Sequence, residues 1–366
     1  MLIVFRRWME RYFADEEAVL VAVLLALSIG IIVTIGDVLA PMISALIIAF
    51  LMQGVVARLK SWGASHILAV SLAFLLLAGS IVVSLVYFLP AIWHQASNLL
   101  GETPRMLKQG QDLMLLLPER YPALVSEDQV RELIEVLRAR LGAIGQKALS
   151  VSLAQLPVIV AALIYLVLVP ILVFFFLKDS NLMLAWVSNM LPRERPVMQQ
   201  IWREMNQQIA NYVRGKAIEI LIVACVSSIC FSLLELKYAL LLGLAVGLSV
   251  LVPYIGAAVA TVPVALIGFF QWGWSTEFLY VMVAYGVIQA LDGNVLVPLL
   301  FSEAVKMHAV AIILAVLVFG GLWGFWGVFF AIPLATLCKA VLNAWPTTAK
   351  MRENIAIAED APLIDS

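Results

Sequence analysis

The chain has 366 residues, of which 63% are hydrophobic and only 13% are charged. A soluble domain is ordinarily about 45–50% apolar and about 25% charged, so this composition excludes a cytosolic globular protein, a disordered tail and a fibrous protein. The 23 Lys and Arg against 24 Asp and Glu leave a net charge of −1, which excludes a broad basic surface for nucleic acid. The expected class is therefore an all-α polytopic membrane protein with about eight hydrophobic segments.

The N-terminal quarter is expected to hold a stub and three membrane spans. Residues 1–17 mix arginines with aromatic side chains, which predicts a cytoplasmic amphipathic stub at the membrane interface. Residues 18–93 then supply apolar runs, each near the roughly 20 residues that a transmembrane helix needs. A tight turn near Gly36 and Asp37 is predicted between the first two spans, and the third span is expected to close at Pro90.

A segment of soluble character follows the third span. Residues 94–147 are predicted to form an extracytoplasmic amphipathic helical segment, with a capping box that starts at Ser126. Apolar residues recur every three or four positions from Val130 to Leu141, which predicts one apolar helix face. This segment is either a packed connector or a lid or partner site. Residues 148–177 are the next predicted span.

The second segment between spans is basic. Residues 178–216 are predicted to form a cytoplasmic amphipathic helix from Pro196 onward, and its basic residues are suited to anionic lipid headgroups. Residues 217–342 form the predicted membrane transport core, and 343–366 form a cytoplasmic tail. Lysines and arginines concentrate in the loops assigned to the cytoplasm, so both termini are predicted to lie there.

Two long apolar runs of this core are each interrupted near the middle. Prolines and glycines at 252–256 and 320–327 predict breaks in the helices. Irregular backbone at membrane depth survives only when it is buried or lines a wet cavity, and paired broken helices often mark the binding site of a transporter. The runs 238–271 and 309–342 are then re-entrant hairpins around a span at 278–300, or else ordinary full spans; the sequence leaves both open.

Two acidic residues interrupt the apolar runs of the core. Asp292 could bind a cation or proton, bind a polar solute, or cap a helix break together with Asn294. Glu219 follows Lys216 by three residues, so it could form a local ion pair or act as a titrating carboxylate.

The candidate pathway residues are those that break the core helices or add polarity to them. They are Glu219, Pro253, Tyr254, Gly256, Gln289, Asp292, Asn294, Pro298, Gly320, Gly321, Gly324 and Gly327. No nucleotide-binding loop and no His or Cys cluster with metal-ligand spacing is found, and the three cysteines lie apart in apolar runs. An enzyme, a cofactor and a metal are therefore not expected.

Four motifs in fixed order resemble the AI-2E (autoinducer-2 exporter) family. They are Tyr-x-Arg-Gly-Lys at 212–216, Val-Pro-Tyr-Ile-Gly-Ala at 252–257, Asp-Gly-Asn with a later proline at 292–298, and the glycine series at 320–333. The resemblance covers nearly the whole chain and implies a multi-pass protein of the bacterial inner membrane.

The resemblance also implies a secondary transporter, a permease or exporter, for a small solute of the autoinducer-2 kind. The alternatives are a Na⁺(Li⁺)/H⁺ antiporter, and a non-transporting membrane scaffold that binds a partner through residues 91–150. Glycine- and alanine-rich faces permit close helix packing, so a homo-oligomer is expected as well.

Overall fold

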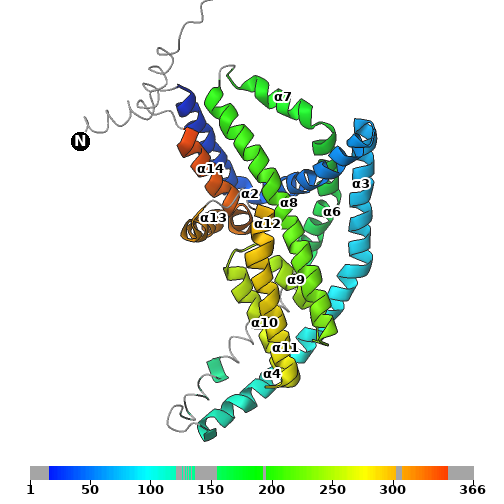
Figure 1. Cartoon of the computed structure of the whole chain (residues 1–366), viewed down its shortest axis with the longest axis vertical. Coiled ribbons are helices and arrows are strands. Elements are labelled where there is room, and N and C mark those ends of the chain that lie inside the picture. The colour runs from blue at the N-terminus through cyan, green and yellow to red at the C-terminus, as the bar shows by residue number, and fades with distance from the viewer. Residues whose placement is uncertain are drawn as a thin grey trace, which may run out of the picture.

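The computed structural model describes residues 16–120, 155–192, 195–301 and 307–344, with a few more between 126 and 136. These residues form helices and no strand (Figure 1). The helices are α2 (Glu16–Ser61), α3 (His66–Val83), η1 (Ser84–Phe88), α4 (Leu89–Arg120), α6 (Gln155–Lys178), α7 (Ser180–Met190), α8 (Pro196–Leu233), α9 (Ala239–Ser249), α10 (Ile255–Trp272), α11 (Thr276–Leu291), η2 (Asp292–Leu296), α12 (Val297–Phe301), α13 (Ala309–Phe329) and α14 (Ala331–Ala344).

Many of these helices are long and apolar enough to cross a membrane, which confirms the all-α polytopic class. Within the described residues there are seven such stretches: Val38–Ser61, His66–Leu116, Val160–Lys178, Pro196–Leu233, Ile255–Trp272, Thr276–Phe301 and Val310–Phe329. Three shorter apolar helical stretches accompany them: Val19–Ile32, Ala239–Ser249 and Ala331–Val341.

The tight turn predicted near Gly36 and Asp37 is wrong: helix α2 bends there instead. Ile35 has non-helical angles (φ −128°, ψ 18°), and helix continues on both sides. Figure 1 shows the two arms of α2 running in different directions from this bend. A side chain at position 36 would strike the ring of Trp323, so the bend lies directly against that ring. A ring seated against a helix can keep it kinked without ending it.

The third span does not close at Pro90 as predicted. One helical column runs through α3, η1 and α4, because a π-helical turn at Ser84–Phe88 precedes the proline. The amide of Leu89 donates to the carbonyl of Ser84, one residue farther back than in an α-helix. The wider turn accommodates the proline ring, which would otherwise clash with the preceding turn.

Helix α8 is the central element of the fold. It starts at Pro196 as predicted, but the predicted surface helix and the span after it are one helix of 38 residues. The carboxylate of Glu17 accepts hydrogen bonds from the amides of Val197 and Met198 and so caps its first turn. Figure 1 shows α8 running through the middle of the molecule, where it packs against α2, α9, α11, α12 and α14.

Two groups of helices have their own buried clusters. Helices α2, α3 and α6 pack around small and branched side chains such as Ala45, Ala69 and Val173. Helices α8 to α11 pack around a second cluster that includes Phe231, Val246 and Val281. Helix α8 also contacts α2, so it joins the two groups.

Several predicted segments lie outside the described residues. These are nearly all of the N-terminal stub, the tail after 344 and most of the amphipathic helix predicted at 126–141. Of that helix the structure describes only isolated residues, and those from 128 to 136 are helical.

Candidate functional site

The first predicted break is present between α9 and α10. Helix α9 ends at Ser249 and α10 begins at Ile255, and Tyr254 between them has a positive φ angle (63°), which is uncommon for a residue with a side chain. A Cβ atom at Gly256 would overlap the carbonyl oxygen of Ser249. Only a glycine allows the start of α10 to lie this close to the end of α9.

The second predicted break lies inside α13. Trp323 and Gly324 leave the helical region, and Gly324 (φ 56°, ψ −133°) has a conformation that a side chain would disfavour. A Cβ atom at Gly327 would overlap the carbonyl oxygen of Phe319. The two breaks therefore share one structural feature: a glycine after the break lies directly against a backbone carbonyl of the helical segment before it.

Helix α8 is hydrogen-bonded to the first break and to the end of α13, which follows the second break. The hydroxyl of Tyr212 donates to the carbonyl of Phe329, just after the second break, over 2.7 Å. The ammonium of Lys216 donates to the carbonyl of Val250, in the first break, over 2.7 Å. Tyr212 and Lys216 are four residues apart and so lie on one face of α8.

Lys216 also forms a buried ion pair. Its Nζ lies 2.8 Å from Oε2 of Glu219, and these residues are only 4% and 1% exposed. The local ion pair predicted for Glu219 is thus confirmed. The Lys216 ammonium lies 5.4 Å from the centre of the Phe301 ring, a cation–π contact that adds to its stabilisation.

A cavity of about 340 Å³ adjoins this ion pair, and we call it the polar cavity. It is lined by Tyr212, Lys216, Glu219, Val250, Val252, Pro253, Tyr254, Ala257, Gln289, Asp292, Gly293, Val297, Phe301, Ile312 and Ile332. Helix α8 forms one wall, the first break another and the end of α11 with η2 a third. Residues far apart in the chain thus converge on one polar space.

The structure brings some of the predicted pathway residues together and leaves others apart. Glu219, Pro253, Tyr254, Gln289 and Asp292 line the polar cavity. The other predicted residues do not line it. Among the glycines, Gly256 and Gly327 allow close backbone contacts, Gly324 has a positive φ angle, Gly320 lies against Val328, and Gly321 has no neighbour within 4 Å of the place that a Cβ atom would take. Asn294 and Pro298 are exposed.

Of the three alternatives left open for Asp292, the capped helix break is contradicted by the structure. Residues Asp292–Leu296 form a π-helical turn inside a helix that continues to Phe301. The amide of Asn294 donates to the carbonyl of Ala290 on its own helix, so Asn294 caps no helix end. As at Pro90, a π-turn precedes the proline, here Pro298. The wider turn makes room for the proline ring, so the helix continues.

Two polar atoms in the wall of the cavity lack a hydrogen-bond partner. They are Oδ1 of Asp292 and Nε2 of Gln289, both buried. Asp292 also lies within electrostatic range of Lys216 and Glu219. Buried polar groups are nearly always paired, so these two atoms are available to a water, ion or solute that enters the cavity.

The role of Tyr212 was missed by reasoning from the residue pattern. Tyr212 entered the sequence argument only through the family motif, because a tyrosine near an apolar run carries no sign of a distant partner. Its spacing of four residues from Lys216 is the signal that could have pointed to a shared face.

Replacing Tyr212 by phenylalanine is expected to cost about 1–2 kcal/mol of folding free energy, because the carbonyl of Phe329 loses its buried partner. The measurement is reversible unfolding in mixed detergent micelles, followed by tryptophan fluorescence. Tyr280→Phe is the matched control, since that side chain is 59% exposed. Equal stability of the two variants would contradict the hydrogen bond.

Comparison with known proteins assigns the chain to a family. Residues 19–347 match the family described as AI-2E family transporter. PerM of Escherichia coli (strain K12) is 46% identical over 346 residues, which cover 94% of this chain and 98% of PerM.

More distant relatives extend over most of the chain as well. YueF of Bacillus subtilis (strain 168) is 26% identical over 335 residues, covering 90% of each chain. The AI-2 transport protein TqsA of Escherichia coli (strain K12) is 24% identical over 316 residues, covering 84% of this chain and 86% of TqsA. The extent of these matches confirms the resemblance drawn from the four motifs: this chain belongs to the AI-2E transporter family.

Proposed function

We propose that this chain is a secondary transporter and that its cargo crosses the bacterial inner membrane through the polar cavity. The observation that carries this proposal is the meeting of Lys216, Glu219 and Asp292 beside the first helix break. Ionisable side chains are costly at membrane depth and usually mark a substrate or ion path. Their position beside an irregular backbone adds carbonyl and amide groups that can contact the cargo.

The size and charge of the polar cavity favour a small cargo that carries positive charge or hydrogen-bond donors. Its volume of about 340 Å³ is near the lower end for ligand sites in proteins. Its lining contains one basic residue and two acidic residues. Lys216 and Glu219 are already bonded to each other, which leaves the carboxylate of Asp292 for the cargo.

A second candidate function, cation/proton antiport, is favoured by the same partnerless oxygen of Asp292. A carboxylate can hold either a proton or a monovalent cation, and the exchange of one for the other is the elementary step of such an antiporter. The relative TqsA, named as an AI-2 transport protein, makes autoinducer-2 the first organic solute to test.

The proposed topology places both termini in the cytoplasm and treats each broken run as a hairpin that enters the membrane and returns. Helix α9 has 11 residues. At 1.5 Å per residue it spans about 16 Å, roughly half of the hydrocarbon core. A helix of this length reaches the middle of a bilayer, where the first break would then lie.

The test uses purified full-length protein in proteoliposomes with an internal pH dye. Na⁺, Li⁺ and K⁺ gradients are imposed in turn on the wild type, on Asp292→Asn and on Glu102→Gln. Glu102 is a matched control because this carboxylate lies outside the polar cavity and its side chain is 38% exposed. For antiport we expect a cation-dependent pH change in the wild type and the control, and its loss in Asp292→Asn.

A wild-type protein that is folded and inserted but gives no pH change would exclude antiport of these cations. Efflux of autoinducer-2 is then measured on the same three proteins, with loss again expected for Asp292→Asn only. If wild type and Asp292→Asn move cations and autoinducer-2 alike, the polar cavity is not the transport site. If neither protein moves any of them, the scaffold alternative is favoured.

A further inference from the structure

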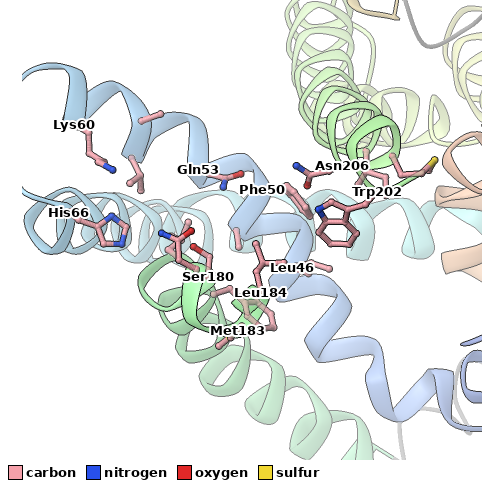
Figure 2. A pocket seen from close by; sticks show the side chains of 18 of the residues that line it. Leu46, Phe50, Gln53, Lys60, His66, Ser180, Met183, Leu184, Trp202 and Asn206 are labelled. Carbon is pink, nitrogen blue, oxygen red and sulfur yellow. The ribbon is translucent and has the colours of Figure 1, made fainter. Parts of the chain in front are cut away.

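A second and larger cavity, separate from the polar cavity, lies between α2, α7 and α8 (Figure 2). We call it the α2–α8 groove, and its volume is about 650 Å³. It is lined by side chains of three kinds: basic or hydroxyl-bearing (Lys60, His66, Ser180), amide (Gln53, Asn181, Asn206) and apolar, of which Leu46, Phe50, Leu184, Met205 and Phe330 are examples. None of the side chains that line it is acidic.

The polar and apolar side chains are distributed along the groove. Figure 2 shows Lys60 and His66 toward one end, and Phe50 and Trp202 toward the other. Lys60 makes one end of the groove cationic, and the other end is mainly apolar, although the amide of Asn206 lies there beside Trp202. This pattern is complementary to an amphipathic anion.

The histidine at the cationic end has one ring nitrogen without a partner. Nε2 of His66 lies 3.2 Å from the carbonyl oxygen of Lys178, and a carbonyl can only accept, so Nε2 carries the proton of this bond. Nδ1 of His66 is buried and has no partner. Nδ1 is then an acceptor in the neutral ring, and a hydroxyl group on a ligand would satisfy it.

The surroundings of the groove are those of a membrane surface. Helix α7, which contributes to its wall, exposes Leu182, Trp186 and Met190 on its outer side. Trp62, just beyond the last turn of α2, is 76% exposed. Exposed tryptophans beside basic residues are typical of the level where lipid headgroups lie.

We propose that the α2–α8 groove binds one anionic phospholipid with a hydroxyl-bearing headgroup, which is the chemistry of phosphatidylglycerol. The phosphate pairs with Lys60, and a headgroup hydroxyl donates to Nδ1 of His66. An acyl chain extends along the apolar lining past Phe50 to Phe330.

This lipid would contact the segment that follows the second helix break. Phe330, which packs against the same hydrophobic cluster as Phe50, stacks on Trp323 with ring centres 6.2 Å apart. The neighbouring residue, Phe329, holds the carbonyl that accepts the hydrogen bond of Tyr212. Occupancy of the groove would therefore stabilise the break in its present form.

The test is lipid binding to the purified, delipidated full-length protein, measured by native mass spectrometry. Phosphatidylglycerol and phosphatidylcholine with identical acyl chains are titrated separately. The wild type is expected to bind phosphatidylglycerol about fivefold more tightly, as expected for one lysine facing an anionic headgroup. Lys60→Gln is expected to remove this preference, whereas Arg58→Gln, an exposed basic residue outside the groove, is expected to keep it.

A second pair of variants tests the groove itself. Ala57 lines the groove, so Ala57→Trp is expected to weaken binding of both lipids. Ala26, an exposed alanine on the other arm of α2, gives the control Ala26→Trp. If Ala57→Trp fails to fold, Leu184→Gln tests the same apolar lining at a half-exposed position.

The proposal is overturned by equal affinity of the wild type for the two lipids, by equal losses in Lys60→Gln and Arg58→Gln, or by unchanged binding in the groove variants. Equal losses would indicate diffuse attraction to a basic surface. This experiment measures lipid binding and not transport. A failure of the lipid proposal therefore leaves the transport proposal untouched, and a failure of the transport proposal leaves the lipid proposal untouched.

Discussion

Replacing Lys216 by methionine is expected to lower the free energy of unfolding by about 3–5 kcal/mol. The change leaves the carboxylate of Glu219, 1% exposed, without its partner at 2.8 Å. It also removes the hydrogen bond to the carbonyl of Val250. Both groups have very little exposed surface, so water from the adjoining polar cavity would replace the lost contacts only in part. The measurement is reversible unfolding in mixed detergent micelles.

A double-mutant cycle assigns this cost to the ion pair. Adding Glu219→Gln to Lys216→Met removes the unpaired charge, so the double variant is expected to be more stable than Lys216→Met alone. The control is Lys237→Met, which breaks the ion pair with Glu102. That pair is 50% and 38% exposed, so a cost of about 0–1 kcal/mol is expected. Equal losses for the two lysines would show that Lys216 is not held in a buried pair.

Substituting alanine for Gly327 is expected to destabilise the protein by about 1–3 kcal/mol, toward the upper part of that range. The added methyl group would overlap the carbonyl of Phe319, and a backbone carbonyl cannot move aside as a flexible side chain does. The matched control lies in the same glycine series. A Cβ atom at Gly321 meets nothing within 4 Å, and Gly321 is helical.

The control is expected to change stability in the opposite direction. Alanine is favoured over glycine inside a helix by roughly 0.5–1 kcal/mol, so Gly321→Ala should be slightly stabilising. Thermal unfolding of both variants in the same detergent gives the comparison. A Gly327→Ala protein as stable as the wild type would mean that the two segments of α13 are farther apart than the structure has them.

The class of fold could be predicted because it depends on composition alone, and the breaks near Pro253 and Gly324 because those residues disfavour helix locally. The closing of the third span at Pro90 was predicted wrongly for a physical reason: a π-turn on the N-terminal side of a proline lets the helix continue, as it also does before Pro298, and no local residue preference reveals such a turn. The bend at Ile35 lies against the ring of Trp323, nearly three hundred residues away, and no local pattern contains that contact.

The candidate site likewise contains residues that could be identified from the sequence and features that could not. Asp292 and Glu219 could be identified because an acid in an apolar run stands out in any sequence. Asp292 lines the polar cavity, and its ion-binding or solute-binding role stays a prediction; the capping role required a helix end that is absent. The glycines of the second break were identified for the right reason, their effect on the helix, yet they shape the backbone and do not line the cavity. Self-association and the orientation of the termini stay predictions.

The hydrogen bonds from α8 to the first break and to the end of α13 have a mechanical consequence. Tyr212 and Lys216 are one helical turn apart, so both side chains donate their hydrogen bonds from the same face of α8. A rotation of α8 about its axis would swing both donors sideways in the same direction and rupture both bonds together. A rotation of α8 is therefore expected to release the two bonded segments together and not one after the other.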